Sequence, residues 1–460
     1  MAKAPLIAFY GDDFTGSTDA LESLAAAGLK ALLFTGVPSP ELLARFEGLE
    51  AIGIAGSSRG MTPDEMAAVM PGVIEALKAT GAPILHYKVC STFDSSPSIG
   101  SFGRVMDIAK RILGPATIPI VVGAPNLGRY SLFGTLFARH NVDNTVHRID
   151  RHPTMSVHPT TPMREADMRR HIGLQTSLTI GLLPAPAIAG SSGKAIAALD
   201  AALALSPDAL LIDIADEAGE AAVGMILETL SLRAPPLFVV GSSGVQYAMV
   251  ARWREDRRLP EAAVIHRARP VDRLLAISGS CSPATGAQIR QSVRDGFDQI
   301  ALDPVAILTE RENGPAVQDA VTRSVALLES GQSVVVHSST GNDDPREALV
   351  AAHFARLGVS KQDGRLQGGR MLAHAAGLIL AQVLDRVPLS RFLVAGGDTS
   401  TTAIKLLGLD ALEMVAPLAP GAPLCRILAP GRALDGTEVV LKGGQMGGPS
   451  YFSQVKDGRL

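Results

Sequence analysis

The chain has 460 residues, more than a single hydrophobic core usually supports, so two or three domains are expected. Its formal net charge of −3, without a basic stripe interleaved with aromatics, argues against an extended nucleic-acid or anionic-membrane surface. The three cysteines, Cys90, Cys281 and Cys425, are too widely spaced for a disulfide framework or a structural zinc site, and a reducing cytoplasm fits them best.

The N-terminal apolar run is too short for a signal peptide, and no run of roughly eighteen apolar residues follows, so neither secretion nor membrane spanning is expected. Short apolar runs instead alternate with longer Ala- and Leu-rich segments. This alternation predicts an α/β fold in which mostly parallel sheets are flanked by helices. The predicted strands are Leu6–Tyr10, Ala31–Thr35, Ala51–Ala55, Ile84–Lys88, Pro119–Val122, Leu210–Ile214, Leu237–Val240, Leu274–Ser278, Ser333–His337, Phe392–Ala395 and Val439–Lys442.

A polar and charged interruption, Arg252–Arg273, is long enough to be a linker, and a new strand with a Gly-rich turn follows it. We therefore place a domain boundary near Pro260–Pro270. The expected domains are residues 1–260 and 271–460, with the active site in the cleft between them.

The first strand runs into Gly11–Asp19, which holds the adjacent carboxylates Asp12 and Asp13. Ser17 or Thr18 can cap the following helix. Ligands of open α/β sheets bind at the carboxyl ends of strands, so a functional role is favoured for the acids. The structural alternative is that they only satisfy turn and helix N–H groups.

The third strand leads to Arg59, which precedes a helix that Thr62 and Glu65 cap as a capping box. An arginine at such a place can bind a carboxylate or phosphate through two parallel hydrogen bonds, although surface arginines are common. The next strand ends in Lys88 and the hydroxyl-rich run that follows it. Such a loop suits a polyol substrate, and the alternative is a solvated Ser/Thr turn.

The segment His152–Met163 carries His152 and His158, followed by a helix that Thr161 can cap. The two histidines are six residues apart with no third ligand nearby, so no metal site is predicted, and a neutral hydrogen-bonding His beside a binding loop is favoured.

Three glycine loops follow strands of the second half, and each begins where a strand ends. The loops are 279–283, 396–400 and 443–448. Glycines and helix starts expose backbone N–H groups to polyphosphate, so nucleotide binding is predicted, although tight βα turns also use glycine. No P-loop, GxGxxG or GxSxG fingerprint is found; Gly190–Ala195 is read as a loop and helix start.

Six motifs occur in order along the chain: GDDFTGSTD, KVCSTFDSS, HPTTPM, SGSCS, GGDTS and LKGGQMG. As a set they closely resemble the four-carbon acid-sugar kinase family over essentially the whole chain. The resemblance implies an N-terminal domain that binds the acid sugar, a C-terminal domain that binds ATP with Mg²⁺, and phosphoryl transfer to the terminal hydroxyl of the acid.

The resemblance also implies site residues. The acceptor side comprises Asp12, Asp13, Arg59, Lys88, Ser91, Thr92, Asp94 and His158, and the nucleotide side comprises Ser280, Gly396, Gly397, Asp398, Thr399 and Gly443. We expect Asp13, and next Asp12, to orient or deprotonate the attacking hydroxyl, while Arg59 and Lys88 hold the carboxylate of the acid. The hydroxyl groups of Ser91 and Thr92 would form hydrogen bonds with the polyol.

Many relatives read Lys-x-x-Asp-Ser-Thr where this chain has Lys88-Val-Cys-Ser-Thr-Phe-Asp94. The variant resembles the branch acting on 3-oxo acids, similar to 3-oxo-tetronate kinases and 3-oxo-isoapionate kinases, which we rank above threonate or erythronate kinases. Two other classes of protein are considered. One is a non-catalytic sugar-acid-binding protein, and the other is an NAD-linked dehydrogenase, which would need a dinucleotide-binding fingerprint that this sequence lacks. Branching and stereochemistry of the acid stay open, and a homodimer is the default assembly.

Overall fold

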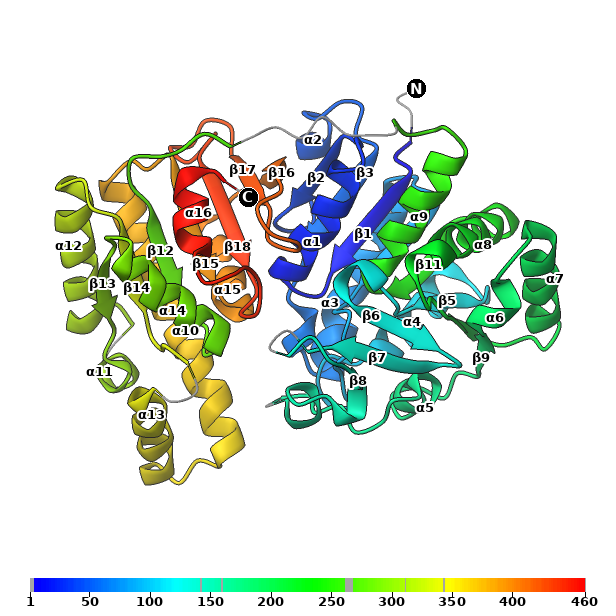
Figure 1. The fold of residues 1–460 in the computed structure, drawn as a ribbon, viewed down its shortest axis with the longest axis horizontal. Helices are drawn as coiled ribbons and strands as arrows, with labels where there is room; N and C mark the ends of the chain where they lie inside the picture. Colours follow the sequence, from blue (N-terminus) through cyan, green and yellow to red (C-terminus); the bar gives the residue numbers. More distant parts are fainter. Residues whose placement is uncertain are drawn as a thin grey trace. The chain divides into compact units, whose positions relative to one another are not determined.

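The computed structural model describes residues 4–140, 143–158, 160–260, 268–310, 312–341 and 344–459. These residues form two compact units, one within Met1–Val264 and one within Ile265–Leu460. We call them unit 1 and unit 2 and describe each separately (Figure 1). Among the described residues, no helix is both long and apolar enough to cross a membrane.

Unit 1 is built on a sheet in which every pairing between neighbouring strands is parallel, in the order β2-β3-β1-β4-β11-β5-β10-β9. The strands are β1 (Ile7–Gly11), β2 (Ala31–Phe34), β3 (Ala51–Ala55), β4 (Ile84–Lys88), β5 (Ile118–Val121), β9 (Ile180–Leu183), β10 (Ala209–Ile212) and β11 (Leu237–Gly241). The central strands are buried along their whole length, because helices cover both faces of a parallel sheet.

The helices of unit 1 connect these strands; α1, for example, packs on β1, β2 and β3 (Figure 1). They are α1 (Phe14–Ala25), α2 (Pro40–Leu43), α3 (Pro63–Ala79), α4 (Phe102–Leu113), α5 (Met168–Gly173), α6 (Ala185–Ile188), α7 (Ser192–Leu203), α8 (Glu220–Arg233) and α9 (Gly244–Glu255). Short 3₁₀ turns are η1 (Ser58–Gly60), η2 (Pro125–Leu127), η3 (Ile149–Arg151), η4 (Met155–Val157) and η5 (Glu217–Gly219). A separate antiparallel sheet comprises β6 (Arg129–Leu132), β7 (Thr135–Arg139) and β8 (Val146–Arg148).

Unit 2 is built on a mixed sheet in the order β13-β14-β12-β15-β18-β17-β16. The pairings from β13 to β18 are parallel, and β17 is antiparallel to both of its neighbours. The strands are β12 (Leu275–Ser278), β13 (Asp298–Ala301), β14 (Val334–His337), β15 (Arg391–Ala395), β16 (Ala411–Ala416), β17 (Leu424–Leu428) and β18 (Glu438–Lys442).

The helices of unit 2 are α10 (Pro283–Arg294), α11 (Pro304–Thr309), α12 (Pro315–Glu329), α13 (Pro345–Arg356), α14 (Lys361–Arg386), α15 (Gly397–Leu407) and α16 (Tyr451–Asp457). Helices α10 and α16 bury Ile289 and Phe452 in one apolar core with strand residues such as Leu393 and Val440. Helix α14 packs against both α12 and α15, and all three helices contact the sheet. Both units are therefore α/β, which confirms the predicted fold class.

All the strands predicted from apolar runs are present, with ends that differ by at most one or two residues. Two local predictions are wrong. Neither Ser17 nor Thr18 caps the first helix, because α1 already begins at Phe14 and Asp13 is its cap. Residues 162–167, directly after Thr161, are not helical, and the next helix, α5, begins at Met168. The Thr161 hydroxyl donates a hydrogen bond to the Asp94 carboxylate instead of capping a helix.

The strand order of unit 1 creates a natural ligand site beside β1. After β1 the chain passes through α1 to β2, which lies on the same side of β1 as β3. After β4, which lies on the other side of β1, the chain continues to β5, farther away from β1. Adjacent parallel strands whose connections leave in opposite directions open a crevice at their carboxyl ends. The loops after β1 and β4 line this point.

Candidate functional site

The loops after β1 and β4 are joined directly, because the Asp12 amide donates a 2.9 Å hydrogen bond to the Lys88 carbonyl. The neighbouring strand β3 delivers Arg59 to the same place through η1, and the Arg59 amide donates to the Asp12 carbonyl over 3.1 Å. Parallel register thus places three predicted site residues at one edge of the sheet.

Arg59 binds both predicted catalytic carboxylates. Its Nε and Nη2 donate to the two oxygens of Asp12 at 3.1 and 2.7 Å, and its Nη1 donates to Asp13 at 2.5 Å. Asp13 also accepts from the Gly16 amide at 2.7 Å and so caps α1. Burial raises the pKa of Asp12 to about 6, although the Arg59 charge opposes this shift. The Arg59 side chain keeps 29% of its surface exposed, so it can still reach a ligand.

Lys88 forms a second ion pair at the same edge. Its Nζ lies 3.3 Å from a carboxylate oxygen of Asp19 on α1, and Asp19 also accepts a hydrogen bond from the Ser243 hydroxyl, just after β11. Gly16 makes this packing possible, because a Cβ there would lie 2.7 Å from the Lys88 Nζ and 2.6 Å from an Asp13 oxygen. Sequence reasoning had named Asp19 only as part of a motif and had missed Ser243.

The hydroxyl-rich segment after β4 forms a network around buried Asp94. The Thr92 hydroxyl donates to Asp94 at 2.6 Å, and the Thr161 hydroxyl lies 3.3 Å from the other Asp94 oxygen and 3.1 Å from the His158 Nδ1. Burial alone would raise the pKa of Asp94, but the charges of Arg59 and His158 and the Thr92 hydrogen bond lower it. Ser91 is half-buried in the same turn.

Arg129, at the start of β6, is a cation that sequence reasoning missed. Its charge interacts with Asp19 and Cys90, which places it beside the cluster just described. Burial lowers the pKa of Arg129, and among the described residues its Nε is buried without a hydrogen-bond partner and no carboxylate pairs with it. Arg59 and Lys88 already neutralise acids, and the Arg129 Nη1 donates to the Leu127 and Arg139 carbonyls at 2.7 and 3.4 Å, so the Arg129 Nε is a donor still open to an anionic ligand.

In unit 2 the three glycine loops converge, because β12, β15 and β18 are adjacent and parallel. The Gly279 amide donates to the Ala395 carbonyl, and the Gly396 amide donates to the Lys442 carbonyl. Gly396 has φ = 117°, a left-handed value that favours glycine. The loops also pack without room for side chains: a Cβ at Gly279 would lie 2.2 Å from the Thr399 hydroxyl oxygen.

The nucleotide-side residues predicted from sequence lie in these loops. Ser280 is buried in the first loop, and a Cβ at Gly444 in the third would lie 2.8 Å from its hydroxyl oxygen. Gly397 and Asp398 begin α15, where exposed N–H groups and the helix dipole attract anions. Thr399 is buried and Asp398 is exposed, while Gly443 directly follows β18.

Lys442 is a further residue whose importance the sequence does not reveal, since the apolar pattern marks it only as the end of a strand. Its side chain is completely buried, and its Nζ donates to the Thr285 hydroxyl at 2.9 Å. Thr285 in turn donates to the Gly444 carbonyl at 2.8 Å. Burial lowers the pKa of Lys442 to about 7, because the charged form is disfavoured without an anion beside it.

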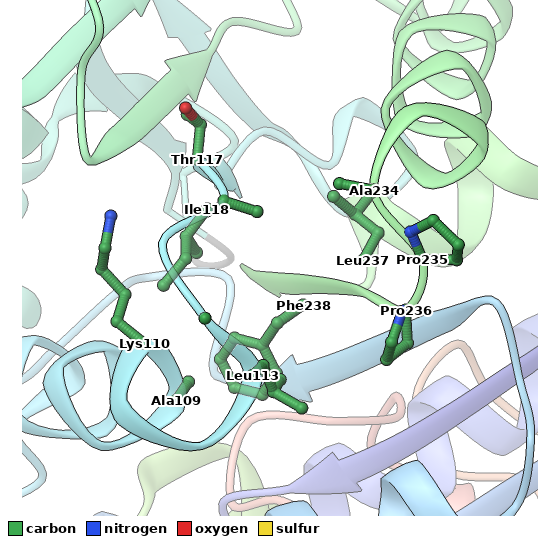
Figure 2. Close-up of a pocket in the computed structure, with 12 residues that line it drawn as sticks. Ala109, Lys110, Leu113, Thr117, Ile118, Ala234, Pro235, Pro236, Leu237 and Phe238 are labelled. Atoms are coloured by element: carbon green, nitrogen blue, oxygen red, sulfur yellow. The ribbon is translucent and has the colours of Figure 1, made fainter.

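Two pockets help to delimit the sites. One lies at the amino-terminal ends of β5 and β11, around Ile118 and Leu237, away from the charged edge of the sheet (Figure 2). The other, a cavity of about 570 Å³ between α13 and α14, is lined by Val350, Phe354 and Arg365 among others. It also includes Glu347, which accepts a hydrogen bond from Cys281 in the first glycine loop, so this apolar cavity adjoins that loop.

Together the sites define a two-unit α/β protein with an acid- and cation-rich edge in unit 1 and a polyphosphate-type loop cluster in unit 2. Two family models match this division: a sugar-binding N-terminal domain over residues 7–249 and a nucleotide-binding C-terminal domain over residues 275–452. The chain belongs to the four-carbon acid-sugar kinase family, as the sequence predicted, and it is a phosphotransferase of that family.

Curated relatives match over almost the whole chain. A protein of Paraburkholderia graminis named 3-oxo-isoapionate kinase is 44% identical over 99% of this chain and 95% of its own length. A protein of Cupriavidus necator named 3-oxo-tetronate kinase is 28% identical over 99% of this chain and 97% of its own.

Solved structures share the fold. A Salmonella typhimurium LT2 protein, described as a candidate tRNA synthase, has a TM-score of 0.76 at 22% identity and covers 99% of both chains. Haemophilus influenzae protein HI1011 has a TM-score of 0.68 at 22% identity over 98% of this chain and 99% of its own. At such identities the likeness supports the fold alone.

The buried Lys442 predicts a pH-dependent stability. Its pKa is lowered to about 7 in the folded chain, while an unfolded lysine keeps a pKa near 10.4, so unfolding takes up a proton between these values. The free energy of unfolding should therefore rise from about pH 7 to about pH 9.5 relative to that of Lys442→Met. Denaturant titrations of both proteins across this range measure it, and parallel pH curves would contradict the prediction.

Proposed function

We propose that the chain transfers the γ-phosphoryl group of ATP to the terminal hydroxyl of a small 3-oxo sugar acid. The observation that carries this proposal is the 44% identity over 99% of the chain to a protein named 3-oxo-isoapionate kinase. Relatives named 3-oxo-tetronate kinase match at 28%, so we favour the branched acid over the linear one. Threonate and erythronate rank below both.

We further propose that residues 1–260 bind the acid and residues 271–460 bind ATP. The matched family models, described as sugar-binding and nucleotide-binding, support this assignment. A cytoplasmic location and a homodimer remain predictions of the sequence. Fractionation of cells and light scattering of the purified protein would test them.

For the acid, we assign the carboxylate to Arg129 and the polyol to the loop after β4. Arg129 has a buried, unpartnered Nε among the described residues, and a carboxylate would supply the missing acceptor. The roles predicted for Arg59 and Lys88 stay predictions; their ion pairs with Asp12, Asp13 and Asp19 indicate that they also orient these acids. Ser91, Thr92, Asp94 and His158 would contact hydroxyl groups.

For the chemical step, we assign to Asp13 the task of orienting the acceptor hydroxyl and accepting its proton. The hydroxyl oxygen forms a bond to the γ-phosphorus as the bond from that phosphorus to the departing ADP breaks. Arg59 fixes the Asp13 carboxylate, and the Gly16 amide fixes its other oxygen. Asp12, bound at both oxygens by Arg59, is the second candidate.

For the nucleotide, the start of α15 offers backbone N–H groups to the phosphates, because no side chain caps it, and Lys442 lies buried beside the glycine loops. Phosphate oxygens would hold Lys442 protonated and so compensate for its burial. Mg²⁺ would neutralise charge on the phosphates when bound, and Asp398, the carboxylate of these loops, is the residue that would hold it.

Asp13→Asn tests the proposed function. Asparagine caps a helix about as well as aspartate, so α1 should be retained while the proton acceptor is lost. ADP formation should fall by about 10²–10⁴-fold with 3-oxo-isoapionate, while ATP binding persists. Coupled assays across 3-oxo-isoapionate, 3-oxo-tetronate, threonate and erythronate measure both activity and acid specificity.

The matched control is Asp303→Asn, which alters another capping aspartate, on α11 of unit 2, and should leave turnover unchanged. Native protein that binds ATP but turns over none of the acids would refute the kinase proposal and favour the rival, a non-catalytic sugar-acid-binding protein.

Arg129→Gln tests the carboxylate assignment. Loss of a charge-assisted pair of hydrogen bonds should raise KM for the acid by about 10–100-fold, with little change in KM for ATP. Arg139→Gln, an exposed arginine on β7 of the same antiparallel sheet, is the control and should behave like the native protein. An unchanged acid KM in Arg129→Gln, at unchanged thermal stability, would remove Arg129 from the site.

A further inference from the structure

Where β7 ends and β8 begins, two histidines and an aspartate lie close together, and the proposed kinase reaction does not use them. In the antiparallel register Ala138 pairs with His147, and His140 lies two residues beyond Ala138. Residues two apart on a strand share a face, so His140 and His147 are diagonal neighbours on one face of the sheet. The His140 amide donates to the Thr145 carbonyl over 2.8 Å, two residues after Asp143.

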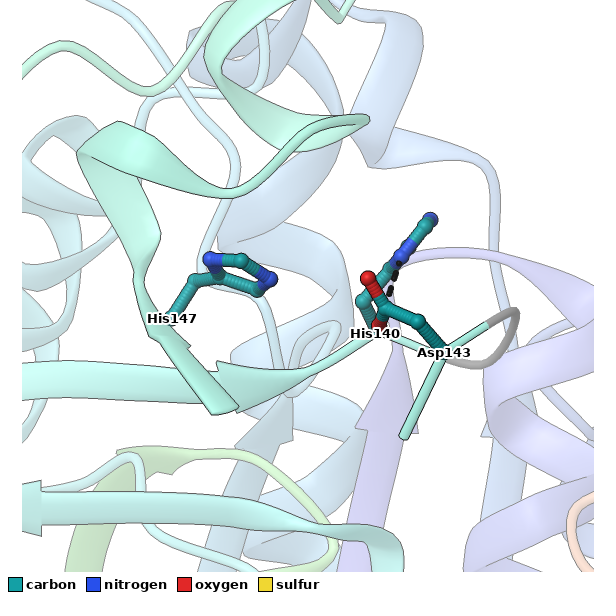
Figure 3. Close-up of side chains that lie close together, drawn as sticks. All are labelled: His140, Asp143 and His147. Atoms are coloured by element: carbon teal, nitrogen blue, oxygen red, sulfur yellow. Dashed lines mark hydrogen bonds and ion pairs between the residues drawn. The ribbon is translucent and has the colours of Figure 1, made fainter. Parts of the chain in front are cut away.

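The three side chains are arranged as a set of metal ligands (Figure 3). One ligand atom of each lies within 4.8 Å of the others, and the His140 Nδ1 already lies 3.1 Å from an Asp143 oxygen. Ligand atoms around a tetrahedral Zn²⁺ lie about 3.4 Å apart, given bond lengths of about 2.1 Å. The Asp143 side chain is 49% exposed, so a change of its rotamer can close the remaining gap.

A second observation independently points to a ligand. The Nε2 atom of His147 is buried, and among the described residues it has no hydrogen-bond partner. A buried imidazole nitrogen without a partner is unfavourable, and a coordinated cation would satisfy it.

The ring of His152 closes the other side of the cluster, at 5.3 Å from the ring of His140 and 5.9 Å from that of His147. The His152 Nδ1 accepts hydrogen bonds from the Thr154 and Met155 amides, so the His152 ring lines the site and this nitrogen is not a ligand.

We propose that His140, Asp143 and His147 bind a divalent transition-metal ion of the Zn²⁺ class. Two imidazoles and one carboxylate form a donor set that Zn²⁺ accepts readily, with a fourth position left for water. Mg²⁺ prefers all-oxygen ligands, so this site is distinct from any Mg²⁺ that accompanies ATP. Neither His152 nor His158, the pair weighed from the sequence, is one of the ligands.

The experiment is a Co²⁺ titration of the untagged, metal-stripped full-length protein, followed by competition with Zn²⁺. Tetrahedral cobalt has visible absorption bands, so the readout does not depend on kinase activity. We expect one equivalent of Co²⁺ with visible bands, displacement by Zn²⁺ and none by millimolar Mg²⁺.

The variants locate the site. His147→Gln and Asp143→Asn should each weaken binding at least about tenfold, while His353→Gln, on α13 of unit 2, should bind like the native chain. Equal affinity of the native protein and His147→Gln would overturn the proposal, as would the absence of cobalt bands in the native protein. Thermal melts of each variant without metal show whether the fold is retained.

Discussion

The contact between the Arg59 guanidinium and the carboxylates of Asp12 and Asp13 organises unit 1. It joins the loop after β1 to the 3₁₀ turn after β3, and the Asp12 amide then joins both to the end of β4. Without Arg59, two adjacent carboxylates would be buried together, which is costly unless their charge is compensated. The remaining polar side chains of the site, around Lys88 and Asp94, are arranged next to this contact.

Unit 2 has a similar α/β architecture, but its candidate site is built from glycine loops instead of paired charges. Its loops carry few charges, and it gathers three glycine loops by placing β12, β15 and β18 side by side. Glycine is required where the loops touch, as at Gly279 and Gly444, because a Cβ would collide with a hydroxyl of a neighbouring loop. The buried Lys442 amine joins them through Thr285, which donates to the Gly444 carbonyl. One unit thus presents paired charges suited to a hydroxy acid, and the other presents a cradle suited to phosphates.

The sequence predicted the parts of this account that depend on local pattern. Apolar runs between turn residues predicted the principal strands, and strand ends rich in acids or glycines predicted the two sites. It missed the strands outside these runs, which are β6, β7, β8, β9, β13, β16 and β17. It also missed Ser243, which follows β11, and Arg129, which follows β5. Both lie near Asp19 because β11 and β5 come next after β4 in the sheet, and this strand order cannot be read from local pattern.

The central claim is that acid and nucleotide bind to separate units, each at the carboxyl ends of its parallel strands. Hydrogen–deuterium exchange with 3-oxo-isoapionate alone, and then with a non-hydrolysable ATP analogue alone, tests it most directly. The account predicts that the acid slows exchange in residues 11–19 and 88–96, while the nucleotide slows it in 279–282, 396–400 and 443–447. Protection of the glycine loops by the acid alone, or of residues 11–19 by the nucleotide alone, would contradict it.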